Sequence, residues 1–140
     1  MSKRQSGFTL LELMITVVVI ATLAALAYYN YSKYAFRTRR SEGQQFLMLV
    51  AAAEERYFTV QNKYTSDITG ASPGGLAFQS NETQNKYYQV TAALGANSTS
   101  YTLTAAPENG QANDSCGSLT ITDQNVKSQT GSTSNGPCWY

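Results

Sequence analysis

An apolar run near the N-terminus limits what this chain can fold into. From Phe8 to Tyr29 the sequence reads FTLLELMITVVVIATLAALAYY, and Glu12 is the one side chain in it that is ionised at neutral pH. As a helix, a run of this length spans about 33 Å, enough to cross a bilayer core of about 30 Å. We therefore expect a transmembrane helix over residues 8–29, which anchors one folded domain built from the rest of the 140-residue chain.

The basic residues, the small residue and the apolar run occur here in a different order from that of an ordinary secretory signal. A secretory signal has a shorter apolar core, and its small-residue cleavage site follows that core. Here the basic residues Lys3 and Arg4 and the small residue Gly7 all precede the apolar run. Cleavage after Gly7 would therefore leave the anchor on the mature protein.

Glu12 is the residue in the anchor that most needs an explanation. A carboxylate inside a bilayer costs at least about 2.5 to 3.5 kcal/mol, so such residues usually have a partner or a function. One interpretation places Glu12 in the first helical turn at the membrane interface, where the helix dipole favours a negative charge. The other gives Glu12 a cationic partner on a neighbouring chain.

The stretch KRQSG followed by FTLLEL resembles the class III leader of type IV pilins and of the related pseudopilins of type II secretion. That resemblance implies that a prepilin peptidase cuts between Gly7 and Phe8 and methylates the new amino group of Phe8. An α-amine has an ordinary pKa near 8 and is largely cationic at neutral pH. Pairing it with Glu12 of an adjacent subunit would offset both desolvation costs and fix the register of the helices.

The sequence after the anchor continues in a helical pattern. Apolar residues recur at spacings of four and three and predict one stripe that faces the rest of the domain: Phe46, Val50, Ala53, Tyr57 and Val60. Since no proline occurs from Phe8 to Thr59, a single helix of about 50 residues is expected. Its weakest point is Gly43, where a bend would cost least.

Beyond the helix the hydrophobic period changes from helical to alternating. A connecting region with a turn at Pro73, Gly74 and Gly75 is followed by alternating apolar residues in YYQVTAAL, YTLTAA and GSLTIT, and a short last strand is expected near Val126. These segments predict an antiparallel sheet whose inner face packs on the helical stripe.

The two cysteines, Cys116 and Cys138, lie near the C-terminus among Gly, Ser, Thr and Asn residues, without the CxxC spacing of a zinc site. We expect a disulfide rather than two unrelated buried thiols. A disulfide also indicates that this part of the chain lies outside the cytoplasm. By the positive-inside rule alone, four basic residues after the anchor would place this part of the chain in the cytoplasm: Lys33, Arg37, Arg39 and Arg40. Because the disulfide and the leader indicate the opposite side, we expect these residues to contact lipid head groups or a neighbouring subunit.

The resemblance to type IV pilins extends over the whole chain. Within that family the chain most resembles the PilE-type minor pilins of type IVa systems, through the stretches RSEGQ, ERYF, YTLTAAPENG, CGSLTI and CWY. It implies an α+β pilin fold, in which a long N-terminal helix packs on an antiparallel sheet and Cys116 and Cys138 bracket a C-terminal loop. The expected parts are a leader (1–7), an assembly helix (8–29), a periplasmic amphipathic helix (30–61), a connecting loop (62–85) and a sheet region (86–140). Many pilins have Gly and Pro where this chain has Ala21 and Tyr29, so the helix lacks those breaks.

The chain has no histidine and no phosphate-binding loop, and we expect neither an enzyme nor a cofactor or metal site. The resemblance implies a structural subunit, held in the bacterial inner membrane and assembled into an extracellular fibre for adhesion and twitching motility. Its expected partners are other pilin subunits, the prepilin peptidase, the inner-membrane assembly platform and, before assembly, membrane lipid.

Three alternatives remain open. The first is a pseudopilin of type II secretion, against which the cysteine pair argues. The second is a DNA-binding pilin for natural transformation, but removal of Lys3 and Arg4 with the leader leaves eight basic residues against nine acidic ones, which gives nucleic acid no special attraction. The third is an uncleaved anchor that carries an unrelated periplasmic domain.

Overall fold

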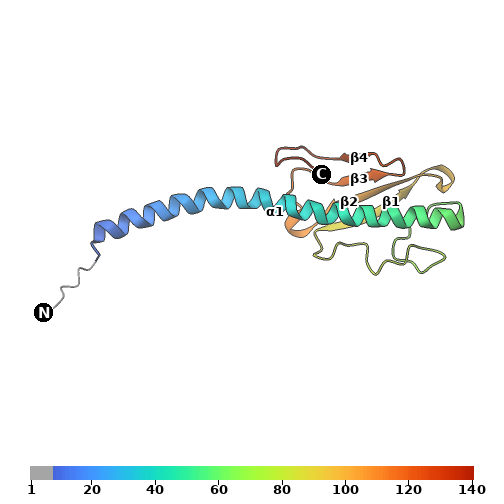
Figure 1. The fold of residues 1–140 in the computed structure, drawn as a ribbon, viewed down its shortest axis with the longest axis horizontal. Helices are drawn as coiled ribbons and strands as arrows, with labels where there is room; N and C mark the ends of the chain where they lie inside the picture. The colour runs from blue at the N-terminus through green and yellow to red at the C-terminus, as the bar shows by residue number, and fades with distance from the viewer. Residues whose placement is uncertain (1–7) are drawn as a thin grey trace. The chain divides into compact units, whose positions relative to one another are not determined.

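The computed structural model describes residues 8–140, except for the side chains of residues 28–30. Its main elements are one α-helix and four strands (Figure 1): α1 (Leu10–Gln61), β1 (Tyr88–Leu94), β2 (Tyr101–Pro107), β3 (Leu119–Thr122) and β4 (Lys127–Gln129). Two short 3-10 helices, η1 (Ala96–Ser98) and η2 (Asn109–Gln111), follow β1 and β2. The chain divides into two units after Tyr34, and the second unit holds the later part of α1 together with the whole sheet. The predicted α+β class is therefore confirmed.

Helix α1 is a single element of 52 residues, as its lack of proline predicted, and it continues through Ala21. Its end has a local cause. Asn62 adopts the left-handed conformation, with φ of 54°, and its N–H donates to the carbonyl oxygen of Phe58 at 2.8 Å. Asparagine tolerates this conformation better than most residues, and it closes the last turn of the helix.

The buried face of α1 matches the predicted stripe only in part. Val50 and Ala53 are buried as expected, but Val60 is 74% exposed, so its placement on the stripe was wrong. Leu47, which the prediction left out, is fully buried. Gly43 is also buried, and three further buried positions are polar, at Arg40, Gln44 and Glu54. A search for apolar spacing cannot detect these polar positions.

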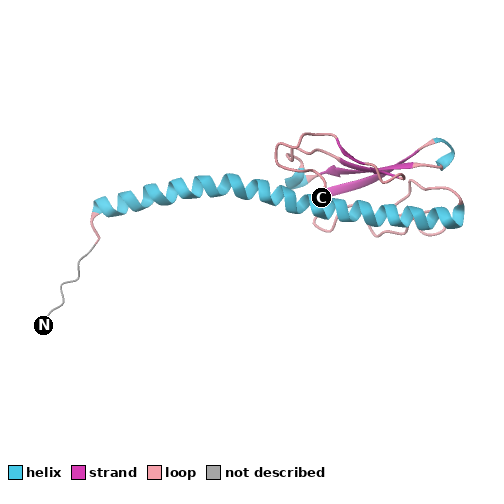
Figure 2. Cartoon of the chain, turned by 45° about the horizontal axis from the view of Figure 1, so that its top comes forward, coloured by secondary structure: helices cyan, strands magenta, loops and turns pink. Residues whose placement is uncertain are grey.

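The sheet is antiparallel, with the strand order β1-β2-β3-β4. Alternate residues point into the core, as the period of two predicted, and the buried ones include Tyr88, Val90, Leu103, Leu119 and Ile121. Leu47 and Val50 of α1 belong to the same core cluster. Figure 2 shows the strands beside the later part of α1, and this arrangement confirms the predicted packing of helix on sheet.

The connection between α1 and β1 contributes to the core instead of only crossing the surface. Tyr64 and Ile68 are buried in the main cluster. Near its end, Glu82 forms an isolated bridge with Gln89, which places this part of the connection beside the β1 edge of the sheet.

Gly43 lies where α1 approaches the sheet closely. A Cβ atom added at Gly43 would lie 2.7 Å from Cδ2 of Tyr88, whose side chain is fully buried. Glycine at this position therefore permits close packing of helix on sheet.

Gly43→Ala is expected to lower the free energy of unfolding by about 1 kcal/mol, because overpacking costs about 1–3 kcal/mol and alanine regains up to about 1 kcal/mol in helix propensity. Urea unfolding of the full chain in detergent micelles measures this. Gly74→Ala is the control, because its Cβ would meet its nearest neighbour, the Ala71 carbonyl oxygen, at 3.5 Å. A Gly43→Ala variant as stable as the wild type would contradict the close approach.

Candidate functional site

The first unit of the chain presents a continuous apolar surface. Every residue from Phe8 to Ala27 is exposed, including Phe8 at 84% and Leu10 at 78%. By length and composition α1 qualifies as a membrane-crossing helix, with a mean hydropathy of 2.5 in its most apolar stretch. An exposed apolar surface of this extent is stable only against lipid or against other protein.

Glu12 lies in the first turn of α1, where Thr9 caps the helix. The backbone N–H of Glu12 donates to Oγ1 of Thr9 at 3.2 Å. Sequence reasoning missed Thr9, although the pattern T-x-x-E in TLLE signals this type of cap. The cap uses the backbone of Glu12, and among the described residues none forms a hydrogen bond or ion pair with the Glu12 carboxylate. Phe8 is the first described residue, and Gly7 lies outside the described residues.

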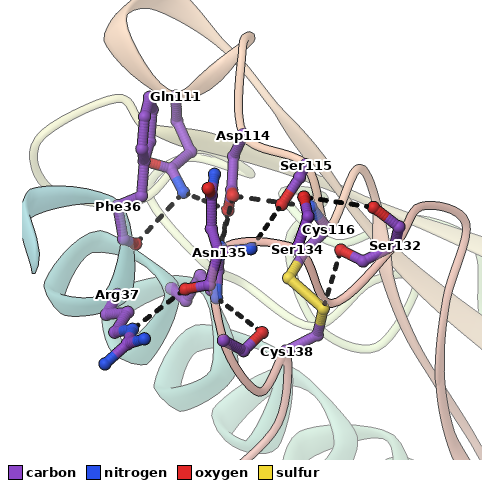
Figure 3. Close-up of polar contacts among 12 residues, drawn as sticks. Phe36, Arg37, Gln111, Asp114, Ser115, Cys116, Ser132, Ser134, Asn135 and Cys138 are labelled. Carbon is purple, nitrogen blue, oxygen red and sulfur yellow. Dashed lines mark hydrogen bonds and ion pairs between the residues drawn. A yellow bond between two sulfur atoms is a disulfide. The ribbon is translucent and has the colours of Figure 1, made fainter. Parts of the chain in front are cut away.

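The second unit holds its C-terminal segment, residues 135–138, through side chains on one face of α1. Arg37 donates through Nε to the carbonyl oxygen of Asn135 at 2.9 Å (Figure 3). Three and seven residues along the helix, Arg40 donates to the carbonyl of Pro137 at 2.9 Å, and Gln44 donates to the carbonyl of Cys138 at 2.7 Å. Residues at this spacing share a helix face, so the three donors bind three main-chain carbonyls of one segment.

A buried ion pair lies beneath this contact. The guanidinium of Arg40 donates to both carboxylate oxygens of Asp114, with Nε 2.6 Å from Oδ2, and neither side chain is exposed. The hydrogen bonding that Arg40 donates to Asp114 is the main cause that raises the pKa of Arg40. Gln111 donates to Asp114 at 2.7 Å, and also to the carbonyl of Phe36 on α1 at 3.2 Å. The pair and Gln111 thus join the loop after β2 to the helix.

These contacts correct the prediction made for Arg40 and give Arg39 partners within its own chain. Arg40 is fully buried against Asp114 and is not available to lipid or to a neighbouring subunit. Arg39 donates to the Gly110 carbonyl at 2.8 Å, and its guanidinium lies 4.4 Å from the centre of the Tyr87 ring. The sequence could not show this, because each partner is more than 45 residues away in the chain.

The predicted disulfide between Cys116 and Cys138 is confirmed, with an S–S distance of 2.03 Å. Both cysteines are buried in the main core cluster. The bond joins the start of the β3 region to the segment held by α1 (Figure 3). The C-terminal segment therefore has two independent attachments, one covalent and one through hydrogen bonds.

Replacing both cysteines by serine is expected to lower the free energy of unfolding by about 3 kcal/mol, the chain-entropy value for a separation of 22 residues. The folded variant should keep the native fluorescence of Trp139, the one tryptophan of the chain, because α1 still holds residues 135–138. Urea unfolding followed by Trp139 emission measures both quantities. An unchanged stability would contradict the first expectation, and an unfolded-like emission in buffer would contradict the second.

Comparison with known proteins places this geometry in a family. Residues 30–120 match the family described as "Type IV minor pilin ComP, DNA uptake sequence receptor", and residues 2–28 match the prokaryotic N-terminal methylation motif. The chain belongs to the type IV pilin family. The resemblance of the leader and the sheet segments to those of type IV pilins is thereby confirmed at the level of the family.

The type IV major pilin PilA of Myxococcus xanthus is 36% identical over 95 residues, which are 66% of this chain and 40% of that protein. The type IV major pilin PilE1 of Neisseria gonorrhoeae is 30% identical over an alignment of 142 residues, which covers 90% of this chain and 84% of that one. A solved type IV pilin from Shewanella oneidensis has a TM-score of 0.52 and 26% identity, and the match covers 75% of this chain and 98% of that chain. The first three curated relatives are matched over about half their length or less, at 40%, 43% and 54%.

Proposed function

We propose that this pilin is a structural, minor subunit of a type IV pilus. It is held in the bacterial inner membrane by the first part of α1, with its head, the second unit (Ala35–Tyr140), in the periplasm. It is then assembled into a fibre for adhesion and twitching motility. The proposal rests on the wholly exposed apolar run from Phe8 to Ala27, most of which lies in α1, joined to a head with its own buried core. Such a helix exchanges lipid for the equivalent helices of other subunits without unfolding the head.

Processing prepares the helix for this exchange. In this proposal prepilin peptidase cuts after Gly7 and methylates Phe8, and the assembly platform brings the mature subunit to the fibre. The amine of Phe8 then pairs with Glu12 of a neighbouring subunit. The first-turn position of Glu12 supports this role, since it places the carboxylate about one turn from Phe8 and leaves it free of partners among the described residues.

The fraction in which the subunit is found tests the proposal. Surface fibres sheared from cells and washed membranes are probed for the chain, with a resident inner-membrane protein as the control for contamination. The proposal predicts the pilin in both fractions and the control protein in membranes alone. A pilin confined to membranes would contradict the proposal and favour a type II secretion pseudopilin.

A second candidate function, DNA binding for natural transformation, is favoured by the match of residues 30–120 to a family described as a DNA uptake sequence receptor. The arginines of the RTRR stretch contribute little to it, because Arg37, Arg39 and Arg40 each have partners within the head. Lys127 is a better candidate contact, because it lies exposed beside the aromatic ring of Trp139, at 5.4 Å.

A shift assay of the full chain in detergent with duplex DNA, repeated over a range of salt concentrations, tests this second function. If DNA is bound through Lys127, Lys127→Gln should reduce the steepness of the salt dependence by about one unit. Lys86→Gln serves as the control, since Lys86 pairs with Glu82 at 3.6 Å. The absence of any shift at low salt would remove DNA binding as a function of this chain alone.

A further inference from the structure

Glu54 is a carboxylate that neither assembly nor DNA binding explains. It lies on the buried face of α1, and none of its side-chain surface is exposed. Its Oε2 accepts a hydrogen bond from the backbone N–H of Thr65 at 3.1 Å, whereas Oε1 has no hydrogen-bond partner. A buried polar atom without a partner is costly and needs an explanation.

The groups around Glu54 do not neutralise a negative charge. The neighbouring charged side chain is Glu55, which accepts hydrogen bonds from the hydroxyls of Tyr64 at 3.2 Å and Tyr101 at 3.3 Å. These tyrosines come from the connection and from β2, and Asp123 adds a further negative charge near Tyr64. Among the described residues no cation forms an ion pair with Glu54. Burial raises the pKa of Glu54 to about 7. The charge of Glu55 adds to this rise, and the hydrogen bond from the Thr65 backbone opposes it.

The contact between Glu54 and Thr65 holds the start of the connection after α1. The hydroxyl of Thr65 donates to the carbonyl of Gly74 at 3.2 Å. This bond ties the chain between the two residues to Thr65. The hydroxyl of Tyr57 of α1 contacts the carbonyl of Pro73 at 3.0 Å and that of Gly74 at 3.4 Å. The segment 62–76 is thus attached to α1 through a buried carboxylate and a few hydrogen bonds, in addition to the core packing of Tyr64 and Ile68.

We propose that Glu54 is a proton-operated latch for residues 62–76, which are held against α1 when Glu54 is neutral and released when it is ionised. The physical reason is solvation. An ionised carboxylate enclosed without a cation is unstable, and opening of the segment lets water reach Oε1. The inference is independent of fibre assembly and of DNA binding.

The direction of the pH dependence follows from proton linkage. Below pH 4.5, the ordinary pKa, Glu54 is neutral in both the open and the closed form, and between 4.5 and about 7 it ionises first in the open form. Opening is therefore favoured increasingly as the pH rises, and the trend levels off above about 7. With these two pKa values, the equilibrium constant for opening rises roughly 70-fold between pH 5 and pH 8.

Hydrogen exchange of the full wild-type chain in detergent micelles tests the latch. Peptides covering residues 62–76 are followed by mass spectrometry from pH 5 to pH 8, and their rates are corrected for the intrinsic pH dependence of amide exchange. The proposal predicts a loss of protection of tens-fold in this segment, and no comparable loss in β2. A corrected protection that does not change with pH would overturn it.

Glu54→Gln and Glu55→Gln separate the latch from general effects of charge. Glu54→Gln keeps the shape of the side chain but cannot ionise, so the segment should stay protected up to pH 8. Glu55→Gln should retain the loss of protection, because Glu54 still titrates. The same pH dependence in Glu54→Gln as in wild type would overturn the proposal.

Carboxyl ¹³C NMR of the wild-type protein gives a reading that needs no variant. It should show Glu54 titrating near pH 7, and a midpoint near the ordinary 4.5 would also overturn the latch.

Discussion

Replacing Arg40 by methionine should lower the free energy of unfolding by about 3–5 kcal/mol, which would make Arg40 one of the most sensitive residues of the head. The substitution keeps much of the side-chain volume but leaves the Asp114 carboxylate buried without its cation. It also removes the donor to the Pro137 carbonyl, and with it one of the contacts that hold the C-terminal segment. Urea unfolding of the full chain in detergent micelles measures the loss.

Two further variants separate burial from charge. Lys86→Met removes the cation of an exposed pair with Glu82, in which the lysine side chain is 71% exposed, and should cost less than about 1 kcal/mol. The double variant Arg40→Met, Asp114→Leu removes both buried charges and should recover much of the loss of Arg40→Met. Equal losses for Arg40→Met and Lys86→Met would contradict the importance of the buried pair.

Replacing Glu12 by glutamine should reduce incorporation of the subunit into fibres by at least about 100-fold, since loss of one partner of a desolvated ion pair costs about 3–5 kcal/mol. The helix itself should be unaffected, because Thr9 caps it through the backbone of Glu12. A quantitative immunoblot of sheared fibres against membranes, normalised to the wild-type subunit, measures incorporation.

Thr16→Val is the matched control for Glu12→Gln. Thr16 is a polar residue of the same exposed helix, but its hydroxyl already donates to the carbonyl of Leu13 at 2.8 Å. Its replacement should leave incorporation within a few-fold of wild type. If Glu12→Gln enters fibres as efficiently as Thr16→Val, Glu12 has no role in docking.

The parts of the fold that depend on local pattern were predictable from the sequence. The unbroken helix follows from the lack of proline, and strands β1, β2 and β3 follow from alternation, because a sheet with one buried face imposes a period of two. The disulfide followed from the only two cysteines of the chain and their surroundings.

The contacts that polar residues make within the head were not predictable from the sequence in the same way. Arg40 and Asp114 are 74 residues apart, and nothing in the sequence near either one indicates burial. Glu54 sits between apolar and charged neighbours in AAAEERYF, where it looks like part of a solvated helix face. Thr9 differs, because its capping pattern was present in the sequence but lay within the apolar run that was assigned to the membrane.

The most direct test of the central claim, that this chain is a processed pilin subunit, is the intact mass of the chain recovered from sheared surface fibres. The recovered chain is expected to begin at Phe8, to carry one methyl group on its amine, and to be two hydrogens lighter than the reduced form because Cys116 and Cys138 are joined. A fibre-borne chain that retains Met1–Gly7, or that has an unmodified amine, would contradict it.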